Sequence, residues 1–367
     1  MQRIYMILVW VLAALAAWGD SPNAPDAIVV GSSAALTGPA AELGLRFHFG
    51  ARAYFDELNR THGMHAESVY RELLDDGYEP TKAQINTQYL LKQPEVVALF
   101  GYVGTPTSNA ALPLVNQARM AFVGAFTGAD SLRNPASPYV FNIRASYEDE
   151  AQVIAKALRH RGVQKLNVLY QYDAFGEAGL AAMRHALKGT GIEIGETASV
   201  PRNMRNVERA VNELVRKQPA DAIYMVSTYA TCASFVRGAR AAGYKGRFYA
   251  LSFTGLEPLR ASLGGDLNGI SVTQVVPDPA RSSLPLAVDY KRAMGKEGAM
   301  TYDAVSFEGY IVARVLGEAL KHAPAHPTRA DVVKALDALG DLDLGGFHLH
   351  FSPGAHDGSH WVELVDE

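Results

Sequence analysis

The side chains best suited to chemistry lie in five short loops that combine hydroxyl groups, small residues and aromatic rings. In the first of these loops, Thr105 is a good N-cap and Pro106 suits the first position of a helix. A helix that begins there presents free N–H groups and a partial positive charge, which can receive a carboxylate or another anion. This combination favours the binding of a small molecule. The loops are residues 104–108, 125–128, 172–176, 227–229 and 252–255.

The motifs of common catalytic sites do not occur in the sequence. It contains no G-x-S-x-G nucleophile elbow, no H-E-x-x-H zinc motif and no G-x-x-x-x-G-K-[ST] phosphate loop. Residues 31–38 resemble a phosphate cradle, but they include no lysine, and Pro39 follows where an N–H donor would be needed. We therefore expect no enzyme activity, no cofactor and no nucleotide site.

Three other groups have both a chemical and a structural interpretation. Cys232 has no catalytic signature around it and is interpreted as a buried thiol. His348 and His350 would lie on one face of a strand, as two metal ligands could, or on an exposed hairpin that happens to contain histidines. Asp75-Asp76 could act as a metal or acid–base pair, although a hydrated strand end is the favoured interpretation. We expect no metal site.

These loops must be positioned by an alternation of strands and helices. Apolar runs and amphipathic runs alternate with short loops, which predicts parallel sheets flanked by helices. The pattern restarts near residues 142–146, so we expect an α/β fold with two lobes, and the five loops fall where parallel strands end. A terminal hairpin is expected, with its turn at Ser352-Pro353-Gly354. The expected strands are 28–36, 68–74, 96–102, 120–125, 166–170, 192–200, 222–226, 248–251, 347–351 and 361–365, and the expected helices are 42–60, 81–92, 110–119, 148–161, 176–188, 206–217, 232–242, 284–295, 304–321 and 329–339.

Length and composition agree with this organisation. A chain of 367 residues is long enough for roughly two domains. Its net charge of −4 and lack of a basic run argue against a nucleic-acid-binding protein, and its single cysteine excludes an intrachain disulfide. Residues 1–19 carry Arg3 and then an apolar run too short to span a bilayer comfortably, which predicts a cleaved signal peptide and export. A retained anchor is the alternative.

The order and spacing of several short segments resemble the branched-chain amino-acid-binding protein family, the type I periplasmic solute receptors of ABC importers. The resemblance covers nearly the whole mature chain. It implies two Rossmann-like lobes joined by three hinge crossovers, near Ile143, Val275 and Leu342. The N-terminal lobe would be residues 27–143 plus 277–342, and the C-terminal lobe 144–276 plus 343–367. The segments that carry the resemblance are Ala35-Leu36-Thr37-Gly38-Pro39, Asp75-Asp76 with Pro80, residues 101–108 and 125–127, Phe175-Gly176-Glu177 and residues 237–243.

The resemblance also implies a ligand site between the lobes. Thr105, Ala125 and Thr127 match positions that hold a ligand carboxylate, and the matches for the walls and cover are Phe175, Thr228 or Tyr229, and Tyr302. Ser252 stands where amino-acid binders carry an acidic residue for the ligand ammonium. Leaving that charge unpaired disfavours a free α-amino acid, unless Asp173 or Glu257 substitutes for the missing acid. The cleft would be unusually aromatic, which suits apolar or aromatic ligands. Its aromatic residues would be Phe126, Phe175, Tyr229 and Phe253.

Together these inferences predict the periplasmic substrate-binding protein of an ABC importer. It would close on a small apolar or aromatic molecule, carboxylate-bearing or a lipid such as a sterol, and deliver it to an inner-membrane permease as a monomer. The alternatives are a binder of branched-chain amino acids or amides, and a ligand-sensing receptor domain for a signalling partner. An enzyme on a Rossmann-like fold is a third interpretation, which lacks any supporting catalytic group.

Overall fold

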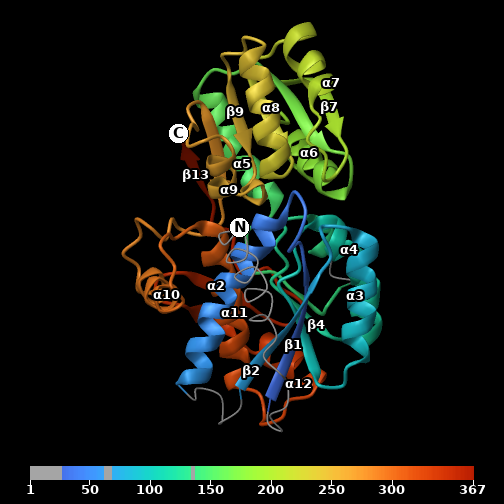
Figure 1. Ribbon diagram of the computed structural model, residues 1–367, viewed down its shortest axis with the longest axis vertical. Coiled ribbons are helices and arrows are strands. Elements are labelled where there is room, and N and C mark those ends of the chain that lie inside the picture. Colours follow the sequence, from blue (N-terminus) through green and yellow to red (C-terminus); the bar gives the residue numbers. More distant parts are fainter. Residues whose placement is uncertain (1–26, 62–67, 134–136) are drawn as a thin grey trace, which may run out of the picture.

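The structure, a computed structural model, describes residues 27–61, 68–133 and 137–367, so the predicted signal peptide at residues 1–19 lies outside the described residues. Two sheets define two lobes, one below the other in Figure 1. Lobe 1 is built on the all-parallel sheet with strand order β2-β1-β3-β4-β5, and lobe 2 on the sheet with order β13-β10-β9-β8-β6-β7. In lobe 2 only the β10–β13 pair is antiparallel. The predicted α/β class with parallel sheets is confirmed.

Lobe 1 contains strands β1 (Ala27–Ala34), β2 (Ser68–Asp75), β3 (Val96–Phe100), β4 (Ala121–Val123) and β5 (Val140–Phe141), with helices α2 (Ala41–Arg60), α3 (Pro80–Lys92), α4 (Thr105–Ala118), α10 (Pro285–Lys296), α11 (Ala304–Lys321) and α12 (Arg329–Asp337). Helices α2 and α11 approach closely because glycines face the opposing backbone. A Cβ atom at Gly50 would lie 1.7 Å from the Ser306 carbonyl oxygen, and one at Gly309 would lie 1.9 Å from that of Phe47. Strand β3 is buried along its whole length, as its uninterrupted apolar sequence predicts.

Lobe 2 contains strands β6 (Lys165–Gln171), β7 (Glu193–Val200), β8 (Ala222–Val226), β9 (Arg247–Ala250), β10 (Ile270–Gln274) and β13 (Glu363–Asp366), with helices α5 (Tyr147–His160), α6 (Ala174–Ala186), α7 (Glu208–Val211), α8 (Tyr229–Ala241) and α9 (Leu256–Ser262). A π-helical segment (Asn212–Lys217) continues α7, and short 3-10 turns lie at Asp130–Leu132 in lobe 1 and Ser252–Thr254 in lobe 2. Helix α5 begins with a capping box in which the side chains of Ser146 and Asp149 satisfy each other's backbone N–H groups.

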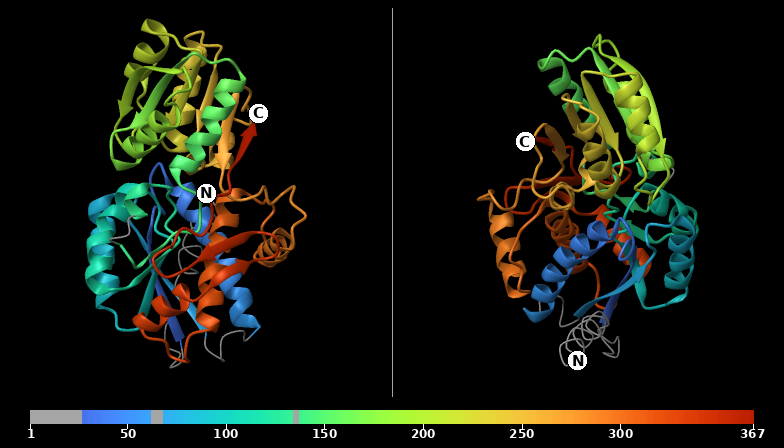
Figure 2. Two further views of the ribbon diagram at one scale, coloured as in Figure 1. Left: turned by 180° about the vertical axis from the view of Figure 1, so that it is seen from behind. Right: turned by 45° about the horizontal axis from the view of Figure 1, so that its top comes forward.

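The chain passes between the two sheets after β5, after β10 and after β12 (Figure 2). The last passage differs from expectation, which placed it near Leu342 and assigned residues 343–367 to the second lobe. Instead β11 (Gly340–Asp343) pairs antiparallel with β12 (His348–Phe351), and the Gly345 carbonyl accepts a hydrogen bond from Leu286 N–H of lobe 1. Only after residue 351 does the chain cross to form β13.

The expected terminal hairpin is therefore wrong in its strand pairing. The chain does turn at Ser352-Pro353-Gly354, where Ser352 and Ala355 exchange backbone hydrogen bonds, but β12 pairs with β11 and β13 pairs with β10. The Asp343 carboxylate accepts from the N–H groups of Gly345 and Gly346, at 2.9 and 2.6 Å. Both glycines have positive φ, 97° and 92°, which glycine adopts without steric cost. This sequence makes the tight turn between β11 and β12, while residues 352–360 run back along lobe 1, where Asn142 N–H donates to the His356 carbonyl.

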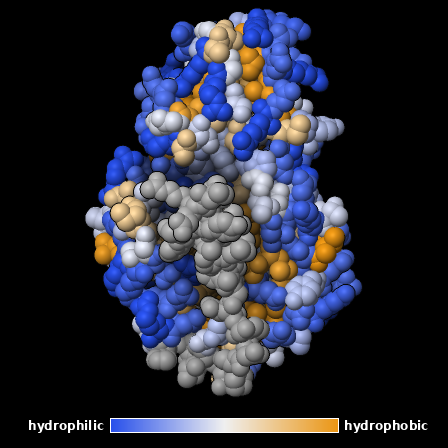
Figure 3. All heavy atoms as spheres, in the orientation of Figure 1, coloured by the Kyte–Doolittle hydropathy of each residue, from blue (hydrophilic) through white to orange (hydrophobic). Residues whose placement is uncertain are grey.

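The surface of the molecule carries both hydrophilic and hydrophobic residues. On the face shown in Figure 3, hydrophilic residues predominate and hydrophobic ones are scattered among them. Within the described ranges, no helix combines the length and apolar character needed to span a bilayer.

Candidate functional site

Two threonine hydroxyls meet at the edge of lobe 1 that faces lobe 2. The loop before α4 is fixed to the loop after β4 by backbone hydrogen bonds from Gly104 N–H to the Phe126 carbonyl, 3.1 Å, and from Phe126 N–H to the Tyr102 carbonyl, 2.7 Å. This places the hydroxyl oxygens of Thr105 and Thr127 2.7 Å apart, with both side chains buried. We call them the hydroxyl pair.

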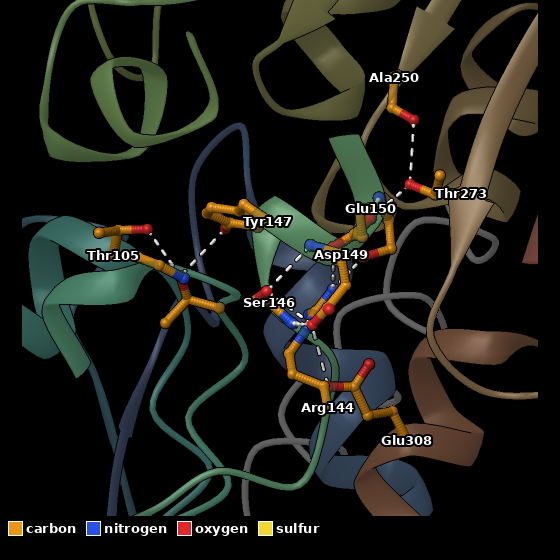
Figure 4. A network of polar contacts seen from close by, with 12 residues as sticks. Thr105, Arg144, Ser146, Tyr147, Asp149, Glu150, Ala250, Thr273 and Glu308 are labelled. Carbon is orange, nitrogen blue, oxygen red and sulfur yellow. Dashed lines mark hydrogen bonds and ion pairs between the residues drawn. The ribbon is translucent and has the colours of Figure 1, made fainter. Parts of the chain in front are cut away.

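Gly104 and Tyr147 complete the surroundings of the hydroxyl pair. Gly104 has a φ of 96°, and a Cβ there would lie 2.1 Å from the ring of Tyr78. From the start of α5, the Tyr147 hydroxyl accepts a hydrogen bond from Thr127 at 3.0 Å (Figure 4). Burial raises the pKa of Tyr147 to about 12, so the phenol stays neutral at physiological pH. The hydroxyl pair can thus donate to an oxygen, and in this structure that oxygen belongs to Tyr147.

A buried cluster of four rings joins the two lobes beside the hydroxyl pair. The ring centroid of Phe253 lies 4.6 Å from that of Phe175, also in lobe 2. From lobe 1, the centroids of Phe126 and Tyr78 lie 5.4 and 5.9 Å from Phe253. All four rings are at most 1% exposed. In this aromatic cluster the Phe253 ring packs against the other three rings from the lobe 2 side.

The remaining predicted positions are distributed around this core. Ala125 is buried beside the hydroxyl pair, and Thr228 is the buried N-cap residue of α8. The Tyr229 hydroxyl reaches across to lobe 1, where it accepts a hydrogen bond from Glu42 N–H at 3.3 Å. Tyr302 lies elsewhere: among the described residues its ring pairs with Tyr290, and it lines a separate cleft between the lobes.

A charge cluster that the sequence analysis did not anticipate lies next to Ser252. Arg144, in the segment that crosses from lobe 1 to lobe 2, has 1% of its side chain exposed, and its Nη2 lies 3.5 Å from Glu150 Oε1. Its Nη1 lies 3.4 Å from Oε1 of Glu308 on α11, and its guanidinium stacks 4.8 Å from the centre of the Phe126 ring. Arg144 Nη2 also donates to the Ser252 hydroxyl. In Figure 4, Arg144, Glu150 and Glu308 of this charge cluster lie on one side of the start of α5, and Thr105 of the hydroxyl pair lies on the other.

The two carboxylates of the charge cluster have different surroundings. Glu150 Oε2 accepts from Ser252 N–H at 2.7 Å and from the Thr273 hydroxyl, and its Oε1 accepts from the Ser252 hydroxyl at 3.0 Å. Burial raises the pKa of Glu308 to about 7, although Arg144 opposes that shift. Burial would lower the pKa of Arg144, but Glu308 and Glu150 hold it above its usual value. Arg144 is therefore always charged, and Glu308 exchanges a proton near neutrality.

The outer edge of the interface between the lobes is closed by a second polar contact. Arg202 of lobe 2 forms ion pairs with Glu79 of lobe 1 at 2.9 Å and with Asp173 at 3.0 Å. The neighbouring Asn203 donates to Glu79 Oε1 at 2.7 Å and to the Gly77 carbonyl at 3.1 Å. We call these residues the rim contact. They hold the lobes together in the arrangement shown.

The other groups singled out from the sequence are structural. Cys232 is fully buried and donates to the Ser227 carbonyl at 3.4 Å, and burial raises the pKa of its thiol to about 12. His348 and His350 are exposed on one face of β12, and no group of three or more potential ligands in the described part of the chain could hold a metal ion. The expectation of a hydrated strand end is wrong for Asp76, because this residue is fully buried. It accepts from the Ser33 hydroxyl at 2.7 Å, and burial raises its pKa to about 6.

Comparison with known proteins gives consistent matches along the whole chain. The model of a family described as periplasmic binding protein matches residues 27–365. The fold is similar to the structure of a possible leucine/isoleucine/valine-binding protein from Rhodopirellula baltica SH 1, with 35% identity, coverage of 95% of each chain and a TM-score of 0.88. It is also similar to a substrate-binding periplasmic protein from Ralstonia solanacearum, with 34% identity, coverage of 92% of this chain and 96% of that one, and a TM-score of 0.87. A leucine-specific-binding protein of Salmonella typhimurium is 22% identical over 337 residues, which cover 90% of this chain and 88% of the relative.

Proposed function

Because this chain belongs to the periplasmic binding protein family, we propose that it is the substrate-binding protein of an ABC importer and that its ligand lies between the two lobes. The observation that carries this proposal is the meeting of the hydroxyl pair of lobe 1 with the Phe175 and Phe253 rings of lobe 2 at one buried interface. A ligand would dock first on lobe 1, and closure of the hinge would complete its cage with lobe 2.

The contacts at this buried interface indicate the class of ligand. The Tyr147 hydroxyl accepts a hydrogen bond from Thr127 of the hydroxyl pair, and the Phe253 ring packs against Phe126 in the aromatic cluster. A ligand in this space must replace these contacts, and a molecule with an apolar or aromatic body and an oxygen acceptor offers equivalent ones. We therefore favour a carboxylate-bearing aromatic or aliphatic molecule, or a larger lipid such as a sterol, over a plain α-amino acid.

The environment of Ser252 supports the exclusion of α-amino acids. Its own side chain carries no charge, and the adjacent Glu150 carboxylate is already engaged by Ser252 and Thr273. A ligand ammonium placed there would lose its hydration without gaining a free carboxylate, which costs several kcal/mol for a buried charge.

A second candidate is a branched-chain amino-acid binder. The names of the relatives from Rhodopirellula baltica and Salmonella typhimurium favour it. A hydroxyl pair of this kind can equally receive the carboxylate of an amino acid. The remaining parts of the proposal are export to the periplasm, a monomeric state and an inner-membrane permease as partner. A ligand-sensing domain is distinguished from a transport protein by whether a permease or a signalling protein binds the closed form.

Isothermal titration against a panel of ligands tests the proposal. We expect micromolar or tighter binding of an aromatic or aliphatic carboxylic acid, and no binding of leucine or valine. Thr127→Val removes a donor of the hydroxyl pair and should weaken binding roughly 5- to 100-fold, because a buried acceptor then loses its partner. Thr81→Val, at an exposed position of α3, is the matched control and should leave affinity unchanged. Tight leucine or valine binding would establish the second candidate instead.

A further inference from the structure

Arg144 is built into the interface between the lobes but does not use all of its donors. A guanidinium offers five N–H groups in a rigid fork. In Arg144 the Nη2 donates to Ser252 and Glu150, whereas Nε and Nη1 are buried without a hydrogen-bond partner. Glu308 stands 3.4 Å from Nη1 as a charge partner only. Buried donors of a charged group are costly to leave unmet, so their presence at this interface points to an acceptor that arrives from outside.

Glu150 cannot serve a ligand cation, since its acceptor sites are taken. A carboxylate has about four lone-pair positions. In Glu150 these receive Ser252 N–H, the Ser252 hydroxyl, the Thr273 hydroxyl and Arg144. A ligand ammonium at this point would also face the guanidinium of Arg144, a like charge in a buried site.

Glu308 is the group of the charge cluster whose protonation can change near neutral pH. The charged groups that act on it are Arg144 and Arg133, which favour its ionised form, and Glu150, which opposes ionisation. Because burial outweighs the two arginines, Glu308 holds a proton over part of the neutral range. When ionised it shares Arg144 with Glu150 and repels an incoming anion, and when protonated it removes that repulsion and becomes a donor itself.

We propose that Arg144 binds an oxygen acceptor of a carboxylic-acid ligand that has no amino group, and that Glu308 takes up a proton from solvent as this ligand binds. This inference rests on the proposed function, since it places the ligand between the lobes, and it names the ligand class and its coupling to pH. The guanidinium excludes the ammonium of an amino acid and accepts an oxo or carboxylate oxygen in its place. Affinity for such an acid therefore falls as pH rises through neutrality.

The test compares three molecules that differ beside the carboxylate: phenylpyruvate with an oxo group, hydrocinnamate with hydrogens and L-phenylalanine with an ammonium. Isothermal titration at pH 7 in phosphate and in Tris, which differ in ionisation enthalpy, measures proton uptake. We expect phenylpyruvate to bind tightest, with uptake of part of a proton, and L-phenylalanine at least tenfold more weakly than hydrocinnamate. Affinity for phenylpyruvate should fall several-fold between pH 6 and pH 8.

Two variants separate the roles of the two side chains. Glu308→Gln should abolish proton uptake while phenylpyruvate still binds, whereas Arg144→Lys should lose tenfold or more of the affinity for phenylpyruvate and less for hydrocinnamate. Glu318→Gln, on the same helix but partly exposed, is the control for loss of a carboxylate and should change neither quantity. Circular dichroism establishes that each variant is folded.

The failures of the two proposals are distinguishable. Equal binding of phenylpyruvate and hydrocinnamate without proton uptake overturns the role of Arg144 and Glu308 but leaves a carboxylate receptor in place. Tightest binding of L-phenylalanine also overturns this inference, because it shows that the site accepts an ammonium. If neither acid binds and leucine does, the proposed ligand class is wrong and this inference falls with it.

Discussion

Glu308 makes the stability of the fold depend on pH in a direction that can be calculated. Its pKa rises from 4.5 to about 7 on folding, chiefly through burial, so the folded state binds a proton more tightly than the unfolded chain. Each tenfold difference in proton affinity is worth about 1.4 kcal/mol, which gives a contribution on the order of 3 kcal/mol. This stability is fully present below pH 4.5 and is lost as pH rises through about 7. Because the side chain is only 4% exposed, solvent screening does not reduce the effect substantially.

Urea unfolding of the wild type and of Glu308→Gln, followed by circular dichroism between pH 5 and pH 8, measures this contribution. The glutamine cannot titrate, and Arg144 keeps Glu150 as its charge partner in the variant. The free energy of unfolding of the wild type should therefore fall by up to about 3 kcal/mol relative to the variant over this range. Glu318→Gln should run parallel to the wild type. If the wild type and Glu308→Gln remain parallel across the whole range, Glu308 does not exchange a proton there and the reasoning is refuted.

Three further predictions concern the interface and the packing. Arg202→Ala removes the ion pairs of the rim contact and should weaken ligand binding about two- to tenfold. The radius of gyration measured by X-ray scattering should increase. An unchanged radius would show that the rim contact does not hold the lobes closed. Phe253→Ala empties the centre of the aromatic cluster and should lower the free energy of unfolding by about 3 kcal/mol. Phenylpyruvate should restore part of this loss by filling the space. No recovery on addition of this acid would argue against a ligand at Phe253. Gly176→Ala places a Cβ 1.8 Å from the Gln171 carbonyl and should cost several kcal/mol in urea unfolding. Its control is Gly295→Ala, which meets nothing within 4 Å on a helix and should be neutral or stabilising by up to about 1 kcal/mol; equal losses in both would contradict the packing account.

The regular part of the fold follows from local sequence. Strand β3 is an unbroken apolar run and α2 has a helical apolar face, so both are found close to where their patterns predict them. The hairpin near the C-terminus was misplaced because two turn sequences compete there. Both Ser352-Pro353-Gly354 and Asp343 with its two glycines form turns, and only the pairing of β12 with β11 and of β13 with β10 determines which strands they connect.

The candidate site was predictable where it lies in loops after strands. Thr105 and Thr127 could be placed together because the carboxyl ends of adjacent parallel strands meet at one edge of a sheet. The charge cluster was not found, because Arg144 and Glu308 are far apart in sequence and each is a single charge. The signal that could have identified them is the apolar sequence around each charge. Arg144 follows the apolar end of lobe 1, and Glu308 interrupts the buried face of α11. A single charged residue inside an apolar segment is rarely buried without a partner. Two such residues of opposite charge are therefore candidates for a buried ion pair.

Native mass spectrometry of the chain purified from its own host tests the central claim most directly. The account predicts one small molecule bound per chain, identified after release as a carboxylic acid without an amino group and lost from the Thr127→Val variant. Release of leucine, valine or another free amino acid would contradict the account.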